Sequence, residues 1–249
     1  MANNNAVFHF DELKMYFGED YIVNGYVTIH TPTVGEIVEF GEQDYYSVIS
    51  TLTAIPSDMK SILYDMGIDY ETISDFEFFY LLTRGCTQDM TRLLFGTLDL
   101  SQMELYKDTQ SEQYVLYHPQ TGEKIDELAY LRIAGYLRKL HGLQAKVEKA
   151  ANPATKKILL ELDRNKRKNN QEKEYSSQLK PLISAMMRYP GFKYKSRELK
   201  DCSIYEFMDT LQGAQIYVAS TSLLQGSYSG MIDTSKISKK EFDWMRSIS

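Results

Sequence analysis

The side chains best able to do chemistry in this 249-residue chain are a few histidines and cysteines. No histidine has a second histidine or a cysteine at a spacing typical of metal ligands. Cys86 and Cys202 are too few and too far apart for a disulfide framework or a CxxC redox pair, so we expect two reduced thiols. We therefore predict no metal site and no cofactor. The histidines are His9, His30, His118 and His141.

Motifs for nucleophilic catalysis and for phosphate binding do not occur: GxSxG, HExxH and GxxxxGK[ST] are all missing from the sequence. Glu36, Glu39 and Glu42 stand at three-residue steps, which would align them on one helix face. A second acidic group clusters across an expected helix end. No substrate cleft accompanies either group, so we interpret both as solvated faces and predict no catalytic residue and no enzymatic activity. The second group is Asp65, Asp69, Glu71 and Asp75.

Charge is divided unequally along the chain. Residues 1–145 carry 22 acidic and 9 basic side chains, net −13, whereas residues 146–249 carry 12 acidic and 19 basic ones, net +7. A basic run between residues 156 and 168 could bind phosphates on one helix face, or serve as a solvated linker, or contact the acidic first half. Interrupting acidic residues and a pI near 5.4 make nucleic-acid binding the less favoured of these.

Turn and cap signals predict the elements of the first half. Asn24-Gly25 between β-branched and aromatic residues predicts a hairpin over 21–30. Apolar residues then recur at helical spacing from Val34 to Leu52, with a break expected at Gly41. A short helix over 59–66, one longer helix over 76–94 capped by Ser74 or Asp75, strand-like runs around 103–117 and a helix over 127–141 follow.

The second half begins with a polar segment in which Asn152 and Pro153 predict a helix start. Helices are expected over 179–187 and 203–225, and a last short one capped by Ser238. The fold class we predict is mainly α with one or two small β-hairpins, in two helical units. The units are an acidic N-terminal one (1–145) with the hairpins and a basic C-terminal one (176–249), joined by a polar basic linker (146–175).

Two short segments of the second unit carry more large apolar surface than their own helices need, IYEFM at 204–208 and EFDWM at 241–245. Core packing is the simpler explanation for such residues. If they are exposed, they would form a groove for a partner helix. The candidate partner-binding residues are Tyr205, Phe207, Met208, Leu211, Phe242, Trp244 and Met245.

Two stretches resemble a known family. VTIHTPTVGEIVEFGEQDYYSVISTLTAIPSDMKSILYDMGIDYETISDFEFF and YKSRELKDCSIYEFMDTLQGAQIYVASTSLLQGSYSGMIDTSKISKKEFDWMRSI are similar to tail assembly chaperones of tailed phages and prophages of Gram-positive bacteria. The resemblance rests on overall pattern. It implies a helical, non-enzymatic protein that coats the tape-measure protein and helps to recruit tail-tube subunits. Self-association is left open as a further partner of the chain.

The resulting expectation is a chaperone that binds and shields the tape-measure protein during tail morphogenesis. The alternatives are a structural virion component, such as a baseplate or connector subunit, and a small nucleic-acid-binding regulator. No apolar run of membrane-spanning length and no secretory signal occur in the sequence, so we expect a soluble protein. The resemblance implies that it acts in the host bacterial cytoplasm.

Overall fold

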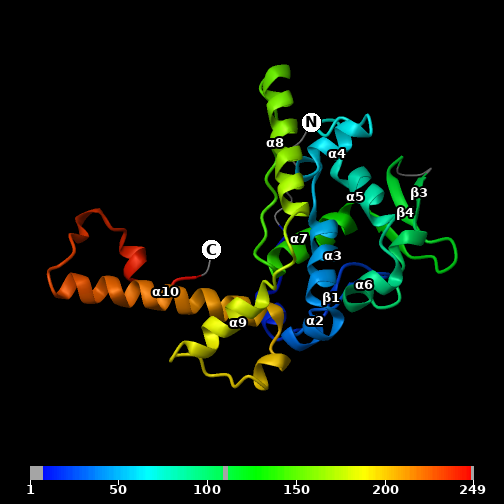
Figure 1. Cartoon of the computed structure of the whole chain (residues 1–249). Helices are drawn as coiled ribbons and strands as arrows, with labels where there is room; N and C mark the ends of the chain where they lie inside the picture. The colour runs from blue at the N-terminus through cyan, green and yellow to red at the C-terminus, as the bar shows by residue number, and fades with distance from the viewer. Residues whose placement is uncertain (1–7, 109–111, 248–249) are drawn as a thin grey trace.

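The computed structural model describes residues 8–108 and 112–247. The prediction of a mainly α protein with minor β structure is confirmed: helices dominate, and the strands of the described residues form one two-stranded and one three-stranded antiparallel sheet. Figure 1 shows a body built around α3 and α7, with α8 rising along one side and α10 extending away from the opposite end.

The predicted N-terminal hairpin is present. Strands β1 (Tyr21–Ile22) and β2 (Thr28–Ile29) pair antiparallel. The Asn24 side chain holds the turn, because its Oδ1 accepts hydrogen bonds from the backbone N–H groups of Tyr26 and Val27, each at 2.8 Å. Helix α1 (Glu12–Tyr16) precedes the hairpin.

The predicted break at Gly41 separates two helices, α2 (Val34–Phe40) and α3 (Glu42–Thr53). Gly41 has φ of 108°, a conformation that residues with a Cβ rarely adopt. Thr33 and Glu36 form a capping box at the start of α2, which satisfies backbone N–H groups on both sides.

The middle of the chain supplies short helices and the larger sheet. The single helix expected over 76–94 is wrong: the chain forms two helices separated at residues 84–87, where Gly85 is a weak helix former and Thr87 occupies a new N-cap position. The elements here are η1 (Pro56–Asp58), α4 (Lys60–Asp65), α5 (Asp75–Thr83), α6 (Gln88–Phe95), η2 (Leu100–Gln102), β3 (Glu104–Lys107), β4 (Tyr114–Tyr117) and β5 (Lys124–Asp126).

Helix α7 (Glu127–Leu140) lies at the centre of the core. Its buried residues recur at helical spacing and pack against α3 and α5. Asp126 caps its start by accepting a hydrogen bond from Ala129 N at 2.7 Å, and Gly142 with φ of 63° follows its end, as the sequence predicts.

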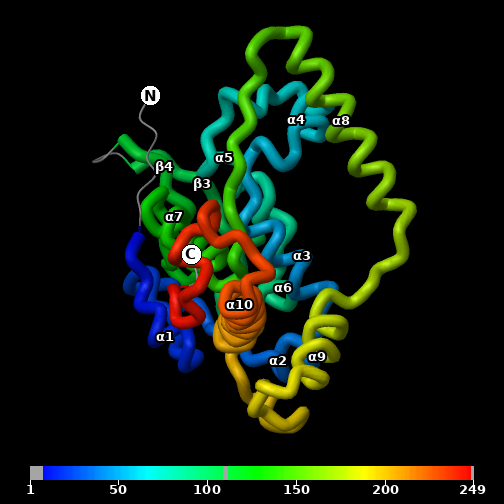
Figure 2. Tube along the Cα trace, turned by 90° about the vertical axis from the view of Figure 1, so that its left-hand side faces the viewer, coloured from blue at the N-terminus to red at the C-terminus, as the bar shows by residue number. Residues whose placement is uncertain are grey.

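Helix α8 (Pro153–Gln171) begins where Asn152 and Pro153 predict it, and the Asn152 side chain caps it. It lies against α4, as Figures 1 and 2 show. Leu160 is buried there with Leu63, Tyr70 and Phe78 in a second, smaller apolar cluster. The segment that joins the two units is thus packed on the acidic half over part of its length.

The C-terminal elements pack into the same core as the first half. Buried residues of α9, η3 and the start of α10 belong to one cluster with α2, α3 and α7. The predicted units and linker therefore differ in charge and in sequence composition. The largest core, however, contains residues of both the N-terminal and the C-terminal unit. The elements are α9 (Leu179–Arg188), η3 (Glu198–Asp201), α10 (Ile204–Tyr228), η4 (Thr234–Lys236) and η5 (Lys239–Phe242).

Candidate functional site

The residues predicted to bind a partner divide into three groups in the structure. Phe207 is fully buried and Leu211 is 9% exposed, and both belong to the main core. The expectation that these two would be exposed is wrong, because the first turns of α10 lie inside the body and this side of the helix faces the core.

Tyr205 and Met208 lie on a different side of α10, half-buried. They line a small pocket of about 220 Å³ between α10 and the end of α7. The Tyr205 hydroxyl donates a hydrogen bond to Glu12 Oε2 at 2.9 Å. Tyr205 therefore joins α10 to α1, a role within the folded chain.

The C-terminal candidates come after α10 in the chain, in η5 and the residues that follow it. Trp244 and Met245 are 51% and 72% exposed, and Phe242 is half-buried. The C-terminal segment folds back beside α10, with η5 packed against the helix. Ser220 Oγ, whose residue is fully buried, donates a hydrogen bond to the Glu241 carbonyl at 2.8 Å. The two apolar segments thus lie at separate places, 204–208 in the first turns of α10 and 241–245 beside a later part of that helix.

Trp244 lines a groove, here called the aromatic groove, whose other walls the sequence did not predict. Its volume is about 720 Å³. The walls come from α1, the end of α9, the loop that follows α9, the middle of α10 and the C-terminal segment. The lining residues that matter below are Tyr16, Tyr189, Phe192, Tyr194, Asp209, Tyr217 and Trp244.

Ring contacts hold two walls of the aromatic groove in place. The rings of Tyr217 and Trp244 meet edge to face, with centroids 5.8 Å apart and planes at 85°. In the loop that follows α9, the ring centroids of Phe192 and Tyr194 are 5.5 Å apart. The Tyr194 hydroxyl donates a short hydrogen bond to Glu206, which fixes the loop to α10.

The helix beside the groove has no charge over most of its length. Residues 210–232, between Asp209 and Asp233, contain no Asp, Glu, Lys, Arg or His. Several apolar side chains of this stretch are exposed, including Val218 at 48%, Tyr228 at 86% and Met231 at 86%. This charge-free run was visible in the sequence and could have identified the helix as an interaction element, whereas the loop 189–194 carries no comparable signal.

Two basic residues of the run on α8 are paired with acidic residues of the first half. Lys156 Nζ lies 2.6 Å from Asp69 and 2.9 Å from Glu71, and Arg164 Nη2 lies 2.5 Å from Asp65. Of the alternatives for this run, contact with the acidic half is the one the structure shows. Lys157, Lys166 and Lys168 are exposed on the same helix.

The acidic group near α2 also has structural partners. Glu36 completes the α2 capping box and lies 3.3 Å from His30 Nε2. Glu42 Oε1 accepts hydrogen bonds from the backbone N–H groups of Gln178 and Leu179 at 2.6 and 2.7 Å, at the start of α9. These carboxylates stabilise helix ends, a role that needs no substrate.

Both cysteines are free and buried. Burial raises the pKa of Cys86, and burial together with a hydrogen bond to Glu206 raises the pKa of Cys202. Neither thiol is therefore activated as a nucleophile. Within the described residues, no group of three or more His, Cys, Asp or Glu side chains is arranged to hold a metal ion.

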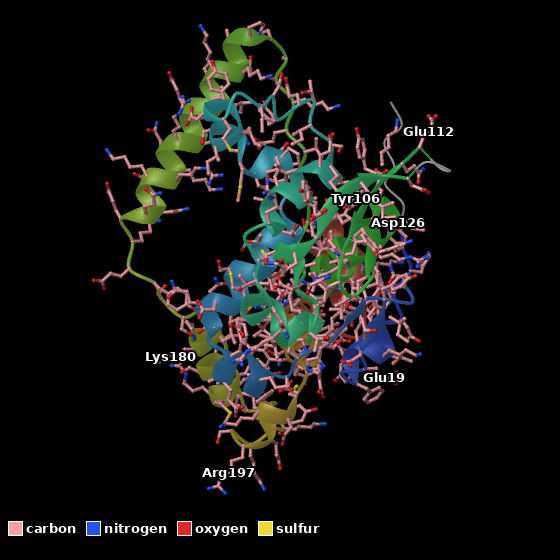
Figure 3. All side chains as sticks on the ribbon, turned by 90° about the vertical axis from the view of Figure 1, so that its right-hand side faces the viewer. Glu19, Tyr106, Glu112, Asp126, Lys180 and Arg197 are labelled. Atoms are coloured by element: carbon pink, nitrogen blue, oxygen red, sulfur yellow. The ribbon has the colours of Figure 1, made fainter. Side chains whose placement is uncertain are left out.

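Two exposed basic residues of the C-terminal half lie outside the groove. Figure 3 shows Lys180 on α9 and Arg197 in the loop before η3, with Arg197 pointing away from the body. None of the helices in the part of the chain that the structure describes is both long and apolar enough to cross a bilayer. Comparisons of the chain with family models, curated proteins and solved structures found no match.

Proposed function

We propose that this protein is a non-enzymatic assembly chaperone of a phage tail, which binds and shields the tape-measure protein in the bacterial cytoplasm until tail-tube subunits replace it. The observation that carries the proposal is the open aromatic groove beside a charge-free helix. The family resemblance of the sequence supplies the identity of the partner.

The groove suits a helical partner for physical reasons. Aromatic rings supply large, rigid contact surfaces, and an amphipathic helix buries its apolar stripe in such a groove. Exposed apolar side chains continue along α10 beyond the groove, at Val218 and Tyr228. A long partner would thus be covered by repeated, individually weak contacts, which a chaperone needs because its partner must later be released.

The regulator alternative has less support, because Lys156, Arg164 and Arg167 of the basic run already contact partners in the chain. A permanent virion subunit would use the same exposed surface. It differs from a chaperone in one outcome, its presence in finished particles.

The test is co-expression of the full chain with the tape-measure protein of the same phage or prophage. We expect the tape-measure protein to be soluble and to co-purify, and the double variant Tyr217→Ala, Trp244→Ala to lose most of this effect. The matched control is Tyr26→Ala, Tyr114→Ala, two exposed tyrosines outside the groove, one in the turn between β1 and β2 and one in β4, 55% and 47% exposed. Failure of the wild-type chain to solubilise the partner contradicts the proposal, and stoichiometric recovery of the chain in purified virions supports the structural subunit instead.

A further inference from the structure

Asp209 is the acidic side chain of the aromatic groove. It lies on α10, half-buried, and its carboxylate has no hydrogen bond or ion pair with any residue that the structure describes. The other charged lining residue is Lys193, which is exposed on the loop. A half-buried carboxylate that has no ion-pair partner is costly, and binding of a cation would reduce that cost.

The nearest cations do not satisfy Asp209. Asp209 lines both the groove and the small pocket, and Arg138 and Lys139 line the small pocket. Lys139 is already paired with Glu12 at 2.9 Å. Burial and the negative charge of Glu12 raise the pKa of Asp209, and Lys139 offsets this only in part.

The rings of the groove provide the second requirement for holding a cation. Six lining residues are aromatic: Tyr16, Tyr189, Phe192, Tyr194, Tyr217 and Trp244. The face of an aromatic ring carries partial negative charge and attracts ammonium and guanidinium groups. In the described residues, the cations that lie over rings do so at other sites, such as Arg92 over Phe40 at 5.5 Å.

At the Arg92 site, an aromatic ring, a cation and carboxylates of this chain already lie together. A hollow of about 470 Å³ there is lined by Phe40, Arg92, Asp44 and Asp89, so that ring, cation and carboxylates come from one chain. The aromatic groove has the rings and the Asp209 carboxylate. Its lysine, Lys193, is exposed on the loop after α9.

We propose that the aromatic groove recognises a basic side chain, lysine or arginine, carried within the apolar stripe of a partner helix, with Asp209 as its counter-charge and the rings as its walls. This inference rests on the proposed function, since it specifies the helix that the groove accepts. Charge complementarity selects this occupant over a second copy of the chain, whose own charge-free α10 stretch offers no cation between residues 210 and 232.

The test uses Trp244, the single tryptophan of the chain, as a fluorescent reporter inside the groove. The full-length protein is titrated with three synthetic amphipathic helices that lack tryptophan and tyrosine. They differ at one position in the apolar stripe, which is Lys, Gln or Glu. We expect the Lys peptide to bind about tenfold more tightly than the Gln peptide and the Glu peptide to bind most weakly.

Asp209→Asn keeps the shape of the side chain and removes its charge. We expect this variant to bind the Lys and Gln peptides with nearly equal affinity, with the affinity for the Gln peptide unchanged. Asp233→Asn makes the same change in net charge at the far end of the charge-free stretch and should keep the tenfold ratio.

The outcomes separate the inference from the proposed function. Equal affinity of the wild-type protein for the Lys and Gln peptides, or an unchanged ratio in Asp209→Asn, overturns the inference while leaving helix binding in place. Absence of binding to every peptide overturns both. A change in Trp244 fluorescence with protein concentration alone, accompanied by dimers in sedimentation, assigns the groove to a second copy and also overturns the inference.

Discussion

Thr33 and Ser203 are the N-cap residues of α2 and α10, and they pair with each other in an isolated antiparallel bridge. Backbone hydrogen bonds flank the pair on both sides, from Val34 N to Cys202 O and from Ile204 N to Pro32 O, each at 2.9 Å. Two helices from opposite ends of the chain therefore start at one point. This junction fixes the base of α10, and with it one wall of the aromatic groove.

Ser203→Ala should destabilise the protein by about 1–2 kcal/mol. The buried Ser203 hydroxyl accepts a hydrogen bond from Glu206 N at 3.0 Å and lies 3.0 Å from the carbonyl of Tyr16, to which it donates. Its loss leaves polar groups at the base of α10 without partners. Urea unfolding measures the change, and Ser238→Ala at the exposed cap of η5 should cost less than about 0.5 kcal/mol. Equal costs for the two serines would contradict the importance of the junction.

Gly35→Ala should destabilise the protein by about 1–3 kcal/mol. A methyl group at Gly35 would lie 2.8 Å from the backbone oxygen of Lys200, where α2 and η3 approach closely, and a backbone atom cannot move aside as a side-chain end can. The same substitution at Gly213, within α10, meets no atom within 4 Å and should stabilise by about 0.5–1 kcal/mol. Thermal unfolding of the two variants should move in opposite directions; a stable Gly35→Ala variant would show that the helices can separate.

Asp163→Ala should loosen α8 from α4. Asp163 accepts hydrogen bonds from Ser61 N at 3.0 Å and from Ser61 Oγ, and it pairs with Arg167. Met59, the N-cap of α4, makes no side-chain cap bond, so Asp163 supplies the missing acceptor from another helix.

Hydrogen exchange measures this effect. Amides of α8 should exchange about tenfold faster or more in Asp163→Ala, whereas amides of α7 should be unaffected. Glu161→Ala, an exposed acidic residue of the same helix, is the control and should change little. Unchanged protection of α8 in Asp163→Ala would mean that its apolar contacts alone hold it.

His141 should make the protein less stable as the pH falls from 6.5 towards 4. Burial lowers the pKa of His141 from 6.5 to about 4, while its Nε2 lies 2.9 Å from the Tyr45 hydroxyl. Below pH 6.5 the unfolded chain takes up a proton that the folded chain does not, which removes up to about 2 kcal/mol by pH 5. His141→Gln should flatten this part of the stability curve in denaturant titrations. A wild-type slope in the variant would contradict the role of His141.

His30 should act in the opposite direction. Although burial favours its neutral form, hydrogen bonds with Asp20 and Glu36 raise the pKa of His30 above 6.5. Its stabilising contribution is therefore present below pH 6.5 and lost as the pH rises through the folded pKa. His30→Gln should be destabilised mainly at low pH, as measured by thermal unfolding at pH 5.5 and 8.5. A loss that is equal at both pH values would show that the ion pairs do not contribute.

The sequence by itself determined the local structure where a few neighbouring residues decide the backbone. Asn24-Gly25 predicts its turn, Gly41 its break between helices, and Asn152-Pro153 the start of α8, and all three are confirmed. Each rests on a cap, a turn or a left-handed conformation, interactions within about four residues. The break between α5 and α6 was missed because apolar residues continue through it at helical spacing.

Tertiary structure decided which helix surfaces are buried, which are exposed and which charges are paired. The stripe that holds Phe207 and Leu211 is core, whereas Trp244 further along the chain lines an open groove, and the sequence pattern is apolar in both places. The aromatic groove draws its walls from segments as distant as Tyr16 and Trp244. Lys156 and Arg164 of α8 find their counter-charges in α4 and the loop after it. Burial and charge pairing depend on which surfaces meet, and no spacing within one segment contains that information.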